Sequence, residues 1–154
     1  MADITPFPTI RNVLYSGTNI ALFTATSLIK AGMAVAFEAT GVSDAVVPAI
    51  KGTTAQPIGV AMTNIAAGAL GAIALDGCIV YVANAESDAD IDAGDMLESN
   101  DNTVGGTVSS CPDVVVAAVA VVKYTLGYAM EPILRSTTGR MMISAGLYTV
   151  PNSA

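Results

Sequence analysis

An acidic run in the middle of the chain has the residue types and spacing of a metal-binding loop. Asp88, Asp90 and Asp92 have the spacing of the first three ligands of a calcium loop. Such a loop needs Gly at its sixth position and a bidentate Glu at its twelfth, where this chain has Ala93 and Ser99. We therefore expect a solvated acidic loop and no bound metal ion.

The usual groups for catalysis are missing. The chain has no His, the commonest general base and metal ligand. It contains no Cys-x-x-Cys, His-Glu-x-x-His or phosphate-binding-loop pattern. Carboxylates for glycoside hydrolysis would have to come from Asp76, Glu38 and Glu131, but their spacing selects no pair and there is no Trp to stack on a sugar. We expect no enzymatic activity, no catalytic residues and no cofactor.

The two cysteines and the charge balance narrow the class of protein further. Cys78 and Cys111 are too few for a disulfide scaffold, so we expect buried free thiols, with a single bridge as the alternative. The net charge is −7, and the six basic residues are scattered. Such a chain neutralises phosphate poorly, so we expect neither nucleic acid nor a membrane as a partner. The first residues lack the positive region of a signal peptide.

Glycine and proline divide the sequence into short segments. With 14 Gly and 7 Pro spread along 154 residues, long helices have little room. Short apolar runs between turn residues are typical of an all-β sandwich or barrel. The predicted strands are Met33–Ala39, Ile58–Thr63, Gly71–Leu75, Cys78–Ala83, Thr107–Ser110, Val114–Tyr124, Leu126–Glu131, Arg140–Ser144 and Leu147–Val150.

The sequence also contains an internal duplication. The segment 58–62 (Ile-Gly-Val-Ala-Met) resembles 126–130 (Leu-Gly-Tyr-Ala-Met), 68 positions later. Upstream, 31–35 (Ala-Gly-Met-Ala-Val) resembles 93–97 (Ala-Gly-Asp-Met-Leu), 62 positions later. The preserved order of these matches predicts two half-repeats, at about 31–83 and 93–150, within one β domain over 31–154. Chance similarity of short Gly/Ala-rich stretches is the alternative.

Residues 1–30 fall outside this duplication and are expected to form an extended N-terminal arm. Their apolar residues are the candidates for contacts with a capsid or another subunit: Ile4, Phe7, Ile10, Val13, Leu14, Tyr15 and Phe23. Such an apolar segment is not expected to remain solvated. It either adds a strand to its own domain or packs on a neighbouring subunit by strand addition. In the second case, deletion of residues 1–25 should leave a folded domain that no longer binds shells.

The order of these motifs resembles that of tailed-virus head decoration proteins, the capsid cement proteins of the β-tulip type. The segments that carry the resemblance are 30–35, 57–62, 66–68, 76–82, 93–95 and 126–131. Residues 101–125, with their long Val/Ala run, depart from the pattern. The resemblance implies a homotrimer on the outer surface of an icosahedral shell, made in the host cytoplasm, that bridges major capsid proteins and stabilises the capsid.

We therefore expect a structural virion protein whose partners are the major capsid protein and further copies of itself. The low proportion of charged residues, 12%, suits a subunit whose surface is covered by neighbours. Two other functions remain open. The chain could assemble into a shell or tube by itself, or it could be a carbohydrate-binding β module on a virion surface.

Overall fold

The computed structural model describes residues 7–38, 45–50, 54, 56–84, 89–100, 105–111 and 121–150. These residues form strands and no helix, which confirms the predicted all-β fold class. The strands are β1 (Leu14–Ser16), β2 (Ile20–Ala25), β3 (Ala34–Phe37), β4 (Ala45–Pro48), β5 (Pro57–Ala61), β6 (Leu70–Ala74), β7 (Ile79–Ala83), β8 (Met96–Ser99), β9 (Val108–Ser110), β10 (Val121–Ala129) and β11 (Thr138–Val150). No helix that could cross a membrane occurs in these ranges.

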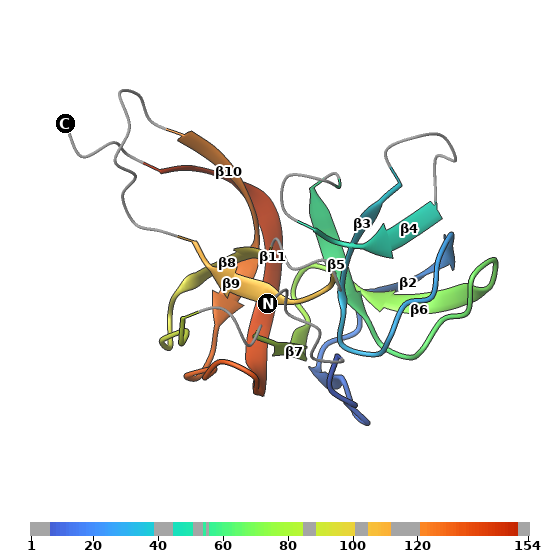
Figure 1. Cartoon of the computed structure of the whole chain (residues 1–154), viewed down its shortest axis with the longest axis horizontal. Coiled ribbons are helices and arrows are strands. Elements are labelled where there is room, and N and C mark those ends of the chain that lie inside the picture. Colours follow the sequence, from blue (N-terminus) through green and yellow to red (C-terminus); the bar gives the residue numbers. More distant parts are fainter. Residues whose placement is uncertain are drawn as a thin grey trace, which may run out of the picture.

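The strands form a closed barrel and a second sheet that lie side by side (Figure 1). The barrel has the strand order β2-β4-β3-β5-β6, and β6 pairs back with β2. The second sheet has the order β1-β7-β11-β10-β8-β9. Neighbouring strands are antiparallel except for β2 and β4, which are parallel.

The barrel strands β2–β6 and the sheet strands β7–β11 pair with one another in the same order. The pair Val60↔Ala74 between β5 and β6 recurs as Tyr128↔Met142 between β10 and β11. Both members lie 68 positions later, at the offset found in the sequence. The parallel pairing of β2 with β4 recurs as a single parallel bridge between Asn84 and Val108. We call the two units repeat 1 (β2–β6) and repeat 2 (β7–β11).

The turns of the two repeats match as closely as the strands. Ile29 and Ile65 form an isolated antiparallel bridge in repeat 1, and Ile91 and Ile133 form the same bridge in repeat 2. All four side chains are buried. The duplication therefore extends beyond the Gly-containing strands to the turns that end them.

Close packing explains why the repeated motif, Φ-Gly-Φ-Ala-Met (Φ is a large hydrophobic residue), has glycine at its second position. A Cβ atom on Gly59 would overlap the carbonyl oxygen of Ala74, and one on Gly127 would overlap that of Met142. In both repeats the neighbouring strand approaches too closely for any side chain. At this motif, β5 shifts register against β3, and β10 shifts register in the same way against β8.

Two hydrophobic clusters form the core. One lies inside the barrel and includes Ile29, Val35 and Ile73. The other joins the repeats, because the outward-facing Val60 and Ala74 of repeat 1 share a cluster with the inward-facing side chains of repeat 2. Strand β5 contacts both β10 and β11 across this junction. Repeat 2 thus covers one outer face of the barrel.

The N-terminal thirty residues differ from the expected arm. Strand β2 closes the barrel between β6 and β4, and β1 pairs with β7 at the edge of the second sheet. A chain lacking residues 1–25 would lose both strands, so the structure argues against the expectation that such a chain stays folded. The sequence of β2, Ile-Ala-Leu-Phe-Thr-Ala, has no alternation of polar and apolar residues that would mark one buried face.

Several strand boundaries also differ from the predictions. β10 continues from Val121 to Ala129 where two strands were predicted, because the register shift near Gly127 lets the strand bend without ending. β11 likewise joins two predicted strands into one. Strands β1, β2, β4 and β8 were not predicted. The greater part of the Val114–Val122 run lies outside the described residues.

Candidate interaction surfaces

The structure distributes the predicted contact residues of the N-terminal segment between core and surface. Phe7 and Val13 are buried, one in each core cluster. Ile10 and Leu14 are half-buried and pack against the core. Phe23 packs edge-to-face on Phe37, Tyr15 is 56% exposed, and Ile4 lies outside the described residues. Burial of Phe7 and Val13 in their own chain leaves Tyr15 as the large side chain of this set most available to a partner.

Tyr15 belongs to an exposed face on repeat 2. Antiparallel neighbours project to the same side of a sheet, and Met142 of β11 is paired with both Ile79 of β7 and Tyr128 of β10. The next row contains Arg140 opposite Tyr81. We call this surface the aromatic face. It consists of Tyr15, Ile79, Tyr81, Tyr128, Arg140 and Met142.

Contacts among its side chains order the aromatic face. The rings of Tyr15 and Tyr81 meet edge-to-face with centroids 6.4 Å apart. The Arg140 guanidinium carbon lies 4.7 Å from the Tyr15 ring centroid, a cation–π distance. Arg140 Nε also donates to Glu131 Oε2 at 3.2 Å. Because each group holds its neighbour in place, the face is ordered before any partner binds.

The ion pair on this face shifts both of its groups toward the charged form. Hydrogen bonds from the Arg140 side chain and backbone N–H lower the pKa of Glu131. The Glu131 carboxylate in turn raises the pKa of Arg140. Both side chains are about one-third exposed, so water screens the pair and its contribution to stability is small.

Part of the aromatic face has a buried counterpart in repeat 1. Tyr128 and Met142 correspond to Val60 and Ala74, which are fully buried against repeat 2. In repeat 2 the same positions have large side chains that are 44% and 37% exposed. At these two positions the fold has a packed junction in repeat 1 and an uncovered surface in repeat 2, whereas Ile20 and Leu22, the counterparts of Ile79 and Tyr81, are exposed. Our sequence analysis missed this surface, although the 68-residue offset already aligned Tyr128 with Val60.

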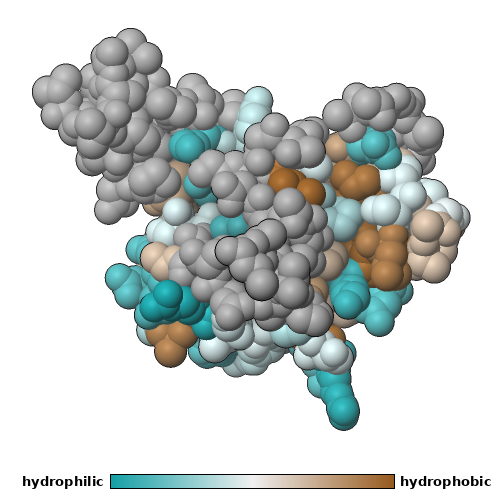
Figure 2. Space-filling model, in the orientation of Figure 1, coloured by the Kyte–Doolittle hydropathy of each residue, from teal (hydrophilic) through white to brown (hydrophobic). Residues whose placement is uncertain are grey.

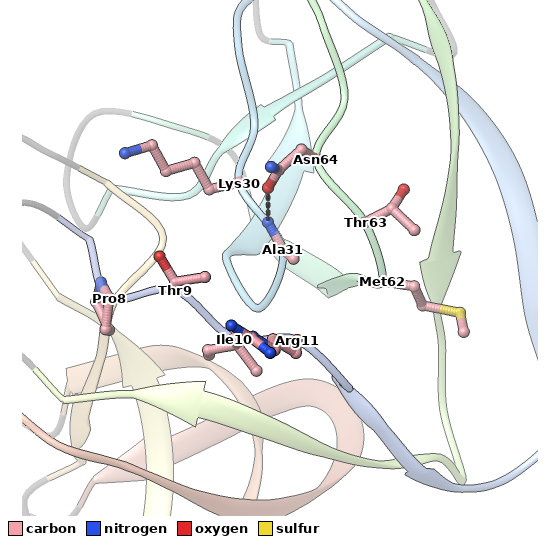
Figure 3. A pocket seen from close by; sticks show the side chains of 9 residues that line it. All are labelled: Pro8, Thr9, Ile10, Arg11, Lys30, Ala31, Met62, Thr63 and Asn64. Atoms are coloured by element: carbon pink, nitrogen blue, oxygen red, sulfur yellow. Dashed lines mark hydrogen bonds between the residues drawn. The ribbon is translucent and has the colours of Figure 1, made fainter.

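A pocket of about 440 Å³ lies beside the barrel, between the N-terminal segment and two turns of repeat 1 (Figure 3). We call it the cationic pocket. Its lining residues are Pro8, Thr9, Ile10, Arg11, Lys30, Ala31, Met62, Thr63 and Asn64. The Ala31 N–H donates to Asn64 Oδ1 at 2.9 Å, which ties the two turns together. Ile10 fills the space above Gly32, so the pocket wall is anchored in the core.

Side chains of the acidic run accept backbone hydrogen bonds, and the two cysteines are buried. Asp90 Oδ1 accepts a hydrogen bond from the Arg135 N–H, and Asp95 Oδ2 accepts one from the Asp92 N–H. Within the described ranges no group of three or more acidic, Cys or His side chains is placed to hold a metal ion, and Asp88 lies outside them. Cys78 and Cys111 are both buried and unbridged.

Apolar surface is not restricted to the aromatic face. On the side of the molecule seen in Figure 2, hydrophobic residues gather over the barrel among hydrophilic ones. Leu22 of β2 and Leu70 of β6 are 66% and 65% exposed. They lie diagonally across the β2–β6 pair, since Leu22 is opposite Ala72. Repeat 1 thus also presents large apolar side chains to its surroundings.

The comparisons with known proteins show a shared fold. No protein-family model matches the sequence, and no curated protein matches it. The chain is similar in structure to the N base of head fiber gp8.5 of bacteriophage phi29. The TM-score is 0.54 at 20% sequence identity, over 81% of this chain and 92% of that chain.

Proposed function

We propose that this chain is a structural virion protein that binds the outer surface of a phage head and stabilises it by bridging major capsid proteins. The observation that carries the proposal is the aromatic face, an uncovered sheet surface on which Tyr128 and Met142 are exposed where their repeat 1 counterparts, Val60 and Ala74, are buried in the junction. The fold similarity to the base of a phage head fiber supports the same location.

The composition of the aromatic face suits binding to another protein. Tyr, Met and Arg are enriched at protein interfaces and supply most of the residues whose loss weakens binding strongly. The Arg140 charge is already paired with Glu131. Docking therefore would not bury an unpaired charge, which is the arrangement that opposes association most strongly.

The mechanism of stabilisation needs no reactive group. A protein that binds only the assembled shell shifts the assembly equilibrium toward that shell by mass action. A single copy has to contact two capsid proteins to act as a bridge, or several joined copies have to contact one each. The rigid junction between the repeats keeps such contacts at a constant separation.

Co-sedimentation with empty shells of the major capsid protein encoded in the same genome tests the proposal. We expect the wild-type protein to bind the shells and to raise the temperature at which they open. Tyr128→Asp places a charge in the middle of the aromatic face and should lower shell affinity at least tenfold, or about 1.4 kcal/mol. Because Tyr128 is exposed, this variant should melt close to the wild type.

Leu28→Asp is the matched control, since Leu28 is also an exposed apolar side chain but lies outside the aromatic face. Normal shell binding by Tyr128→Asp, or no binding by the wild type, would contradict the proposal. Electron microscopy of the purified chain addresses the rival function, because sheets or tubes formed without capsid protein would indicate a self-assembling shell subunit.

A further inference from the structure

The cationic pocket has charges that no described residue neutralises. In the part of the chain that the structure describes, Lys123 is near Glu98 and Arg140 is paired with Glu131. The side chains of Arg11, Lys30 and Arg135 form no such pair with described residues, and of these Arg11 and Lys30 both line the pocket. In a chain of net charge −7 with six basic residues, two unpaired cations at one pocket indicate a site for an anionic group.

The corresponding surface of repeat 2 has the opposite charge. Through the offsets of 62 and 68 that relate the strand pairs, Lys30 corresponds to Asp92 and Thr63 to Glu131. Met62, at the apolar wall of the pocket, corresponds to Met130. The Lys30 turn of repeat 1 is therefore basic, and the corresponding Asp92 turn of repeat 2 is acidic.

The acidic turn is small and ordered. Asp92, Ala93 and Gly94 are exposed, and no described residue bonds to the Asp92 carboxylate. The turn is nevertheless held firmly, because the Asp92 N–H donates to Asp95 Oδ2 and the Gly94 N–H donates to the Ala129 carbonyl. A fixed backbone with a free carboxylate loses little conformational entropy on binding.

We propose that the turn Asp92–Asp95 of a second copy of this chain docks in the cationic pocket, with the Asp92 carboxylate close to Arg11 and Lys30. Figure 3 labels both residues among those that line the pocket, Arg11 on the N-terminal segment and Lys30 on the turn before β3. The pocket volume of about 440 Å³ is within the range of protein sites that accept small groups. The inference rests on the form of the proposed function in which several joined copies bridge the capsid proteins, and it names the contact that joins them.

This contact joins two different surfaces, so each copy offers one pocket and one turn. Such a head-to-tail contact closes into a ring when its rotation allows and otherwise continues as a filament. Opposite charges at the contact also offset the repulsion between acidic copies. Rising ionic strength should weaken it, because exposed charges are screened within about 8–10 Å at physiological salt.

Charge reversal across the contact is the test, measured on the full chain by native mass spectrometry and sedimentation equilibrium. Lys30→Glu and Asp92→Lys should each raise the self-dissociation constant at least tenfold. The double variant restores an opposite-charge pair and should return to within a few-fold of the wild type. Ser27→Glu, an added charge at an exposed position outside the pocket lining, should leave association unchanged.

Three results would overturn the inference: a monomeric wild type, an unchanged Asp92→Lys variant, or a double variant no better than either single one. Shell co-sedimentation of the same preparations reports on the proposed function separately. If Lys30→Glu loses shell binding while self-association persists, the occupant of the pocket is the capsid and the proposed copy-to-copy contact is wrong. Melting curves of all four variants ensure that only folded proteins are compared.

Discussion

Gly127 is a residue whose substitution should show how closely β10 and β11 are packed. A methyl group at Gly127 would overlap the Met142 carbonyl oxygen, so we expect Gly127→Ala to lower the free energy of unfolding by about 1–3 kcal/mol. Gly146 lies in the same sheet, and a Cβ there meets nothing within 4 Å. Gly146→Ala should therefore be nearly neutral in urea unfolding. Equal effects of the two changes would show that strand propensity, not close approach, explains the repeated glycine.

The Glu131–Arg140 pair should make stability depend on pH in the acid range. Because the pKa of Glu131 is lowered in the folded state, its contribution is present above the unfolded pKa of about 4.3. The contribution disappears as pH falls through the folded pKa. Thermal melts of the wild type and Glu131→Gln should therefore differ at neutral pH and converge in acid. A difference that persists at low pH would mean that packing, not charge, is responsible.

Strand β2 is the element on which barrel closure depends. It pairs with β6 on one side and β4 on the other, so a chain that starts at residue 26 leaves two strand edges and the barrel core open. We expect this truncation to lose its cooperative thermal transition by circular dichroism and to bind a hydrophobic dye. A chain that starts at Phe7 keeps both N-terminal strands and is the control. A cooperative melt of the longer truncation would contradict this role of β2.

The junction between the repeats makes the two units one folding body. Val60 is fully buried there, and a carboxylate at this position cannot be solvated. We expect Val60→Asp to lower the free energy of unfolding by about 3 kcal/mol or more. Tyr128→Asp is the equivalent change in repeat 2, where the side chain is exposed, and should be tolerated. Comparable destabilisation of both variants would show that repeat 2 also uses this face inside the molecule.

The all-β class and the internal duplication could both be predicted from the amino-acid sequence alone. Both depend on local sequence patterns: the spacing of Gly and Pro, and the repeated Φ-Gly-Φ-Ala-Met motif. In that motif a side chain at Gly59 or Gly127 would overlap the neighbouring strand. The apolar character of the N-terminal segment was also visible. The role of that segment was not visible. Phe7 and Tyr15 are both aromatic, and only the packing of the folded chain shows that Phe7 is buried and Tyr15 is exposed.

Only the tertiary structure decided which faces are covered. Val60 and Tyr128 occupy the same place in their repeats, and one is buried because repeat 2 lies against it. Lys30 and Asp92 likewise became a matched pair of surfaces only when their turns were superimposed through the strand register. Exposure depends on contacts between segments far apart in sequence, so no local pattern contains it.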